Sequence, residues 1–337
     1  MTDTVVKEAF LALVRRGLKT GKGGSFPALD IRQWECVLEL GTAQGVTGLL
    51  FSGVESLPPE IVVPEQVIFR LMVEADRIMR KTGKVSKAAD SLVKALEAKG
   101  LHPIIMKGPA VAAYYQDPNL RESGDLDIFL RPGEFEAAVD TLSIKDYHKD
   151  PDGNILYSWE GVQIDQHPRY FDLHSKKFLE LETDSPETQL LMLSLHIRKH
   201  CMGAGVGLRQ ICDMAMAYRA LLKQSDNQRL LDLYKESGSS KWNLLLASFI
   251  KEYLGDILLP YPDGISLPDP VPLYKIVFSG GSFGHYDPSR KDALKKGGPS
   301  RKLDTLTRIL RRIPFSFRYA KNEFFHYLSS LINGNIS

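Results

Sequence analysis

The segment RESGDLDIFL, residues 121–130, places two aspartates one residue apart at the start of an apolar run. Alternate residues of a strand share a face, so Asp125 and Asp127 point one way while Leu126 and Ile128 point the other. Holding two carboxylates together costs free energy unless a cation binds them. Mg²⁺ and Mn²⁺ prefer oxygen ligands, so the segment predicts a divalent-metal site on a strand. The alternative is an exposed strand start with solvated acids.

A third acid strengthens the prediction of a metal site. In VQIDQH, residues 162–167, Asp165 shares one face of the expected strand with Gln163 and His167. If this strand lies beside residues 125–130, three carboxylates converge, as a two-metal phosphoryl-transfer site requires. We expect Asp165 to bind the catalytic ion and to help deprotonate the acceptor. The alternative is a single aspartate that faces solvent.

The segment MKGPAVAAYY, residues 106–115, has features of a phosphate site. Gly108 lets the backbone approach a ligand closely, and Lys107 adds positive charge. The helix expected after Gly108 would point its N-terminal N–H groups at phosphate. Arg121 and Ser123, in the loop before the acids, are further expected phosphate contacts. The alternative is an ordinary turn between a strand and a helix.

The spacing of apolar residues changes twice along the chain. Helical spacing dominates residues 3–18, 30–52 and 64–99, short strands and helices alternate in 101–173, and helical spacing returns after Ser185. We therefore predict an α+β fold, with a small mixed or antiparallel sheet as its core and helical regions on both sides. The expected divisions are a helical region (1–99), the α+β core (100–175), a helical domain lining the cleft (176–260) and a loop-rich segment with basic helices (261–337).

Composition excludes several classes of protein. The 337 residues carry a net charge of +2, so no strong field demands a nucleic-acid partner. The three cysteines are odd in number and lack metal-ligand spacing, which favours reduced thiols and a cytoplasmic protein. They are Cys36, Cys201 and Cys212. No apolar run approaches the length of a membrane span, and the N-terminus lacks a clear signal peptide.

The segments KGPAVAAYY, RESGDLDIFL and IDQH together resemble the DNA polymerase β-like nucleotidyltransferase superfamily. More narrowly, they resemble an uncharacterised bacterial nucleotidyltransferase family with the motifs K-G-x-x-A, R-x-x-G-D-x-D and I-D-x-H. The resemblance covers residues 101–220 well. It implies that Asp125, Asp127 and Asp165 bind two Mg²⁺ or Mn²⁺ ions and that Gly108 contacts the triphosphate. Pro109 departs from the usual Gly-Ser or Gly-Gly, and proline offers no N–H to a phosphate.

The resemblance continues into the helical segments after Ser185. His196 and His200 are four apart, as in zinc proteases, but Ile197 replaces the glutamate that such a protease needs. They are expected to line the cleft or to cap a packed surface. Arg209 and Asp213 are expected to line the cleft or to form an i,i+4 ion pair. His167, on the strand with the third acid, is a further expected cleft residue.

Together these features predict a nucleotidyltransferase that moves a nucleoside monophosphate from an NTP, such as ATP, to an acceptor and releases pyrophosphate. The acceptor is a small molecule, a protein or RNA, and the sequence does not favour nucleic acid. One alternative is a degenerate transferase that binds nucleotides or serves as a scaffold. Another is a toxin-like transferase that modifies tRNA or protein, which the basic tail between Arg290 and Lys321 suggests.

The acid cluster also predicts an effect on stability. Without metal, three close carboxylates should repel one another and raise at least one pKa. We expect Asp127→Asn to relieve this repulsion, so that the metal-free variant is at least as stable as the wild type.

Overall fold

The computed structural model describes residues 4–21, 25–150, 152–173, 182–203, 205–281, 311–321 and 323–325 and contains a five-stranded mixed sheet. The strands are β1 (Ile104–Ile105), β2 (Leu126–Phe129), β3 (Tyr147–Lys149), β4 (Ile155–Trp159) and β5 (Val162–His167). Their order is β1-β2-β5-β4-β3, and only β2 and β5 run parallel. The chain therefore has the predicted α+β fold.

The register of β2 and β5 brings the acids of two distant segments together. Asp127 on β2 is the direct partner of Asp165 on β5. The other face of both strands is apolar, and Leu126, Ile128 and Ile164 lie there, fully buried in one hydrophobic cluster. The alternation of residues thus places Asp127 and Asp165 on the same face of the sheet, opposite these apolar side chains, as predicted.

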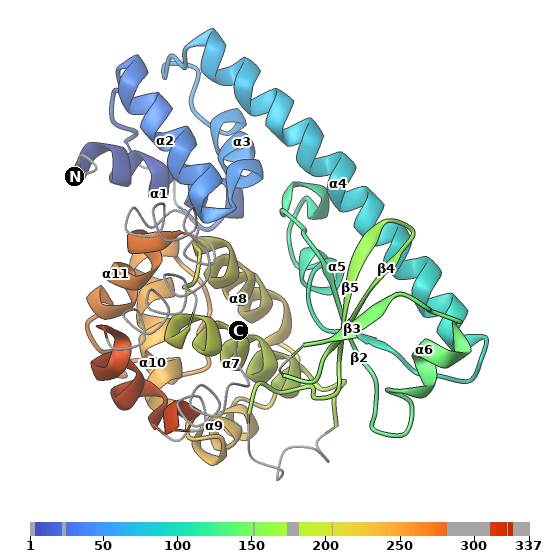
Figure 1. Cartoon of the computed structure of the whole chain (residues 1–337). Coiled ribbons are helices and arrows are strands. Elements are labelled where there is room, and N and C mark those ends of the chain that lie inside the picture. Colours follow the sequence, from blue (N-terminus) through green and yellow to red (C-terminus); the bar gives the residue numbers. More distant parts are fainter. Residues whose placement is uncertain are drawn as a thin grey trace.

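Most of the helices lie on one side of the sheet, and α4 (Glu65–Glu97) runs along it (Figure 1). On the N-terminal side the others are α1 (Thr4–Leu18), α2 (Ile31–Gln44) and α3 (Thr47–Glu55). Between the strands lie α5 (Pro109–Ala112), the 3₁₀ turn η1 (Pro118–Leu120) and α6 (Ala137–Thr141). After the sheet follow α7 (Pro186–Met202), α8 (Leu208–Leu221), α9 (Asn227–Glu236), α10 (Ser240–Phe249), the π-helical turn η3 (Ile250–Leu254) and α11 (Val271–Gly280). None of the described helices is long and apolar enough to cross a membrane.

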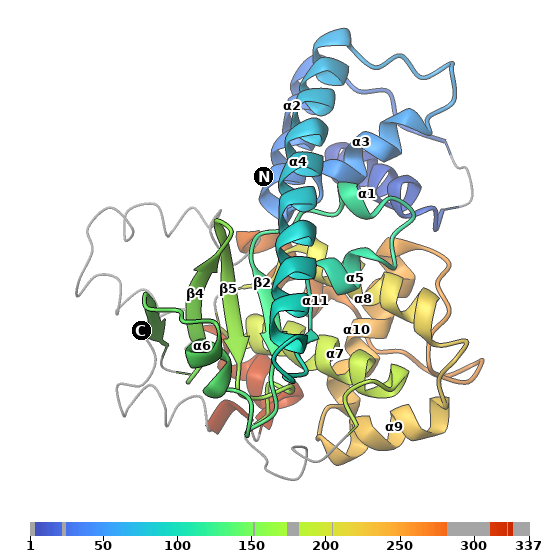
Figure 2. The same cartoon turned by 90° about the vertical axis from the view of Figure 1, so that its right-hand side faces the viewer.

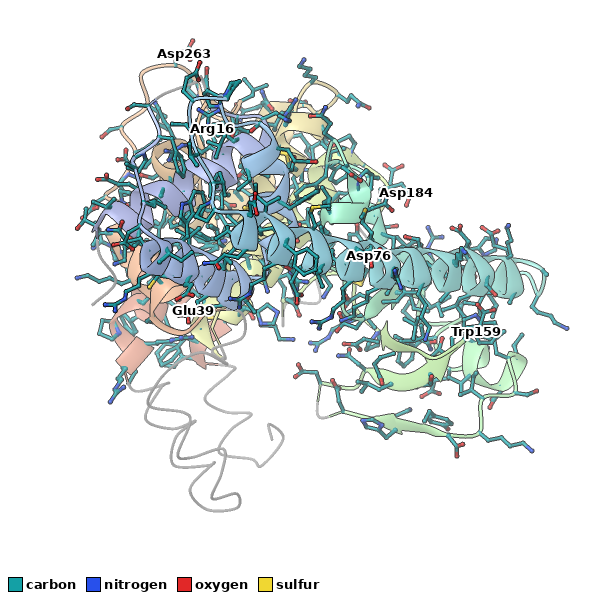
Figure 3. The ribbon with its side chains drawn as sticks, turned by 90° about the horizontal axis from the view of Figure 1, so that it is seen from above. Arg16, Glu39, Asp76, Trp159, Asp184 and Asp263 are labelled. Carbon is teal, nitrogen blue, oxygen red and sulfur yellow. The ribbon has the colours of Figure 1, made fainter. Side chains whose placement is uncertain are left out.

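Two hydrophobic cores share the long helix α4. Its second half covers the apolar face of the sheet, where Val85, Leu92 and Leu96 are buried. Its first half packs Val67 and Leu71 into a larger core built from α1–α3 and α7–α11. Figures 2 and 3 show α4 reaching from the N-terminal helices to the sheet, with Asp76 near its middle. The N-terminal and C-terminal helices thus enclose one core, and the sheet lies to one side of it.

Local signals explain several element boundaries. Ser185 accepts a hydrogen bond from the backbone N–H of Thr188, and Pro186 opens α7, as the sequence predicted. The single helix predicted for residues 30–52 was wrong, because Gly45 adopts a left-handed conformation (φ 64°) that ends α2. The helix after Gly108 is only four residues long, and β5 ends before Pro168.

Two elements were not predicted. Strand β3 is a short, exposed edge strand, and its three residues carry no alternating pattern. Helix α11 follows Pro270 within the loop-rich segment, where the sequence predicted no helix before the basic tail. Residues 311–319 of the basic tail are helical, whereas 282–310 and 326–337 lie outside the described residues.

Candidate active site

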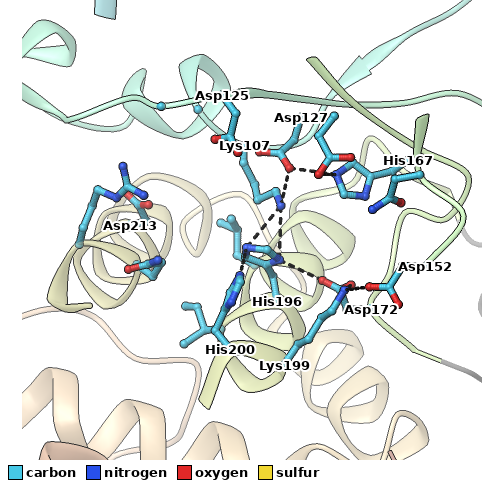
Figure 4. Close-up of a pocket in the computed structure, with 18 of the residues that line it drawn as sticks. Lys107, Asp125, Asp127, Asp152, His167, Asp172, His196, Lys199, His200 and Asp213 are labelled. Atoms are coloured by element: carbon cyan, nitrogen blue, oxygen red, sulfur yellow. Dashed lines mark hydrogen bonds and ion pairs between the residues drawn. The ribbon is translucent and has the colours of Figure 1, made fainter. Parts of the chain in front are cut away.

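A cavity of about 320 Å³ opens on the polar face of the sheet, between β2 and β5 on one side and α7 and α8 on the other (Figure 4). Eleven of the twelve residues expected from the sequence to bind metal or nucleotide or to line the cleft border it. They are Lys107, Gly108, Arg121, Asp125, Asp127, Asp165, His167, His196, His200, Arg209 and Asp213. Ser123 is buried behind the wall, where its Oγ accepts a hydrogen bond from Arg121 Nη1 (3.3 Å).

Asp127, Asp165 and His167 form a group that could hold a metal ion. One ligand atom from each residue lies within 4.8 Å of the other two. His167 Nε2 is 2.9 Å from Asp127 Oδ1 and 3.5 Å from Asp165 Oδ2. Asp165 Oδ1 is buried and has no hydrogen-bond partner. A buried, unpartnered carboxylate oxygen is suited to a cation, so these residues fit a divalent metal.

Asp125 borders the same cavity but lies outside this group. It precedes the first residue of β2, so it has no strand partner, and it is exposed. His167 joins the group instead, because it lies two residues after Asp165 on the same face of β5. That spacing was visible in the sequence, which predicted His167 as a cleft residue but not as a ligand.

Lys107 supplies a positive charge inside the group. Its Nζ lies 2.7 Å from Asp127 Oδ1, and the two side chains are only 12% and 10% exposed. The same Nζ is 3.3 Å from His196 Nε2 on the opposite wall. Lys107 therefore connects the polar face of the sheet to α7 (Figure 4).

The two paired aspartates differ in pKa. Burial raises the pKa of Asp127, but Lys107 and the hydrogen bond with His167 outweigh burial and hold that pKa well below its usual range. Burial raises the pKa of Asp165 to about 6, and the negative charge of Asp127 contributes, although His167 and Lys107 oppose the rise. At neutral pH the site thus contains one strongly stabilised carboxylate and one that is poorly stabilised.

The wall formed by α7 carries a second network. Asp172 Oδ2 lies 3.0 Å from His196 Nδ1, and His196 Nε2 lies 2.9 Å from His200 Nε2. Burial and the charge of Lys107 lower the pKa of His196, so this imidazole is neutral at pH 7. Lys199 Nζ lies 3.0 Å from Asp172 Oδ1 and 2.9 Å from an oxygen of Asp152. Sequence reasoning missed Asp152 and Asp172, because no motif or periodic spacing marks them.

The wall formed by α8 is held to the loop before β2. Arg121 binds Asp213 with both ends of its guanidinium, through Nε (3.1 Å) and Nη2 (2.7 Å). The Tyr115 hydroxyl donates to Asp213 Oδ1 at 2.7 Å. Arg209 donates from Nη1 to the backbone oxygen of Glu122 (2.7 Å). Arg209 and Asp213 both border the cavity, and the alternative for them, an i,i+4 ion pair, does not form. Asp213 is paired with a residue 92 positions away instead.

Gly108 lies where the chain turns from β1 into α5. Its φ of 62° is a conformation that glycine adopts readily and other residues adopt at a cost. Pro109 follows as the first residue of α5. The turn borders the cavity beside Lys107, and the missing N–H of Pro109 removes one donor from it.

A mixed sheet that presents two paired carboxylates from adjacent parallel strands, faced by a helical wall, agrees with the nucleotidyltransferase fold that the sequence resemblance implies. The family model described as "Uncharacterised nucleotidyltransferase" matches residues 30–255, and the chain belongs to that family. The match includes the whole sheet and the α7–α8 wall. A search of curated proteins gave no match.

Proposed function

We propose that this protein transfers a nucleoside monophosphate from an NTP, such as ATP, to an acceptor hydroxyl or similar group and releases pyrophosphate. The observation that carries the proposal is the register of β2 and β5, which pairs Asp127 with Asp165 at the cavity. Two adjacent carboxylates with a buried, unpartnered oxygen are what a divalent ion needs as ligands. Family membership supports nucleotidyl transfer in general.

In the proposed site, Asp127, Asp165 and His167 hold Mg²⁺ or Mn²⁺, and Asp125 offers a carboxylate to a second ion at the edge of the cavity. When bound, the ions neutralise charge on the phosphates and on the departing pyrophosphate. In this proposal Asp165, on β5 beside the ion, also accepts the proton of the acceptor. Lys107, Gly108 and Arg121 border the space for the phosphates.

The proposed division of the chain keeps residues 1–99, 100–175, 176–260 and 261–337 as separate regions. In it, the α+β core supplies the carboxylates and the region from 176 to 260 supplies the opposite wall of the cavity. This arrangement places acceptor and nucleotide between two structural units, which is a common location for ligand sites.

The experiment is incubation with each labelled NTP and Mg²⁺ or Mn²⁺, with and without cell extract, followed by detection of a labelled product. We expect labelling with wild type and its loss with Asp165→Asn, which keeps the shape of the side chain and removes its charge. Asp140→Asn, at an exposed position in α6, is the matched control and should label like wild type. Equal labelling by wild type and Asp165→Asn would contradict the proposal.

A second candidate is a protein that binds nucleotides without transferring them. Two observations favour it. Pro109 has no N–H to donate to a phosphate, and Lys107 forms an ion pair with the Asp127 oxygen that a metal ion would need. This candidate predicts NTP binding in calorimetry together with no labelled product for any NTP, metal ion or extract.

A further inference from the structure

The first turn of α8 contains a buried side-chain donor without an acceptor. Gln210 is 6% exposed and borders the cavity. Its Oε1 accepts a hydrogen bond from the backbone N–H of Gly207 (3.2 Å), which fixes the amide. Its Nε2 has no partner among the described residues. A buried, unsatisfied amide donor costs free energy, so this group is suited to a ligand that brings an oxygen.

Arg209 precedes Gln210 and also has a buried donor without an acceptor. Its Nη1 donates to the backbone oxygen of Glu122, but its Nε is buried without a partner. No carboxylate of the described residues lies within ion-pair distance of Arg209, because the nearby Asp213 is bound by Arg121. A partly buried guanidinium with no carboxylate in ion-pair contact is suited to an anionic ligand.

The helix end adds further donors. Of the N–H groups at the start of α8, that of Leu208 is bound by Gln44 Oε1 (2.7 Å) and that of Gly207 by Gln210. The N–H groups of Arg209 and Gln210 are among the first four of the helix, which have no acceptor within it. The helix has 14 residues, so its N-terminus also carries the positive end of a dipole.

We infer that the first turn of α8 is an anion subsite that binds the phosphate chain of the nucleotide, across the cavity from the carboxylates of β2 and β5. The inference rests on the proposed function for the identity of the ligand. Convergent donors from a guanidinium, an amide and a helix N-terminus suit an ion with several oxygens, such as pyrophosphate. This turn and Asp127 border the same cavity, so both face the space in which the phosphate chain would lie.

The test uses inorganic pyrophosphate, the full chain and EDTA, with binding measured by calorimetry. Gln210→Glu is the informative variant, because glutamate also caps a helix at this position and keeps the contact to Gly207. It replaces the free donor with a negative charge at the helix N-terminus, where an acid is stabilising. We expect wild type to bind pyrophosphate and Gln210→Glu to bind it at least about 10-fold more weakly, the loss typical of one charge-assisted hydrogen bond.

Arg219→Met is the matched control. It changes the charge by one, as Gln210→Glu does, but lies in the last turn of α8, about 15 Å along the helix. We expect it to bind within about twofold of wild type, because charges at that distance are screened. An equal loss in both variants would show a general charge effect and overturn the subsite.

Arg209→Met gives an independent measurement and should also weaken pyrophosphate binding about 10-fold or more. Absence of pyrophosphate binding by wild type, or full binding by Gln210→Glu, overturns the inference. Competition by metal-free NTP, with no competition by inorganic phosphate at equal concentration, identifies the phosphate chain of a nucleotide; the reverse order identifies a phosphorylated acceptor and overturns it. Because these measurements need no metal and no transfer, labelling without pyrophosphate binding would refute only the subsite, and pyrophosphate binding without labelling only the proposed function.

Discussion

Asp127 and Asp165 are direct neighbours on parallel strands, yet their pKa values move in opposite directions. The difference comes from Lys107, which lies 2.7 Å from Asp127 and makes no such contact with Asp165, and from the hydrogen bond between His167 and Asp127. The expected repulsion between the acids is therefore present, and it raises the pKa of Asp165 alone. The sequence could not show this, because Lys107 reaches Asp127 from the turn after β1, a separate segment of the chain.

Asp127→Asn should therefore destabilise the metal-free protein, contrary to the expectation from the sequence. The variant leaves Lys107 and His167 without the charge that both contact. A lost charge-assisted hydrogen bond in a buried site costs about 2–3 kcal/mol. Urea unfolding in EDTA measures the difference, and an unchanged or higher midpoint would restore the earlier expectation. The rise in melting temperature that Mn²⁺ produces in wild type should also be absent in this variant.

Asp165→Asn should have the opposite effect, and the effect should depend on pH. The pKa of Asp165 is about 6 in the folded protein against an ordinary value of 3.8, so the folded state binds the proton more tightly. The ionised carboxylate thus costs stability above pH 6, and the cost disappears as the pH falls towards 4. We expect Asp165→Asn to be more stable than wild type by up to about 3 kcal/mol at pH 7.5.

The two proteins should be equally stable near pH 4, where Asp165 is protonated. Urea unfolding of both at pH 4, 5, 6 and 7.5, in EDTA, gives the stability difference at each pH. A difference that is constant with pH would show that Asp165 does not titrate in this range. A wild type that is the more stable protein at pH 7.5 would show that Asp165 is stabilised by a partner.

At the scale of elements, the Arg121–Asp213 pair joins the loop before β2 to α8 and so fixes the width of the cavity. Both side chains are 7% exposed. Asp213→Asn leaves the Arg121 guanidinium buried without its counter-charge, which costs about 3–5 kcal/mol. Tyr115→Phe is the matched control, because it removes only the 2.7 Å hydrogen bond to Asp213 and should cost about 1 kcal/mol. Equal unfolding midpoints for the two variants would show that the ion pair contributes nothing beyond a neutral hydrogen bond.

The elements also show how far the sequence could predict the site. Alternation within β2 and β5 gave the faces of Asp127 and Asp165, because a strand's periodicity is local. Their pairing depends on the register between two strands whose paired residues are 38 positions apart in the chain. The sequence alone could not show that these strands are neighbours. Asp172 lay outside any pattern, because its role comes from α7 packing against the end of the sheet.

The predictions from the sequence were wrong where a single residue changed the structure that the surrounding pattern indicated. Gly45 ends α2 within a continuous helical spacing, through its left-handed conformation. The i,i+4 spacing of Arg209 and Asp213 was correct as local geometry, since both lie on α8. Their pairing was nevertheless prevented by Arg121, whose guanidinium offers a bidentate geometry to Asp213.

At the scale of the whole molecule, α4 couples the two hydrophobic cores. The helix has 33 residues and is about 50 Å long. Leu71 in its first half and Leu92 in its second are almost completely buried, in different cores. A rigid helix shared by two cores makes it costly for one of them to unfold alone. We therefore expect the metal-free protein to unfold in a single cooperative transition.

The tryptophans allow this prediction to be tested. Trp34 and Trp242 are buried in the larger core, and Trp159 packs against the smaller one beside the sheet. Variants that keep one tryptophan, with phenylalanine at the other two positions, report the cores separately through fluorescence during urea unfolding. Coincident midpoints are expected for the Trp242 and Trp159 reporters.

Leu71→Ala and Leu92→Ala complete the measurement. Each removes buried side-chain volume from one core and should cost about 2–5 kcal/mol. If α4 couples the cores, Leu71→Ala lowers the midpoint at the Trp159 reporter as much as at the Trp242 reporter, and Leu92→Ala does the same. A variant that shifts only the reporter in its own core would show that the sheet and the helical core unfold independently. The cavity would then lie between two independently stable units, and its geometry would depend on contacts such as Arg121–Asp213 rather than on α4.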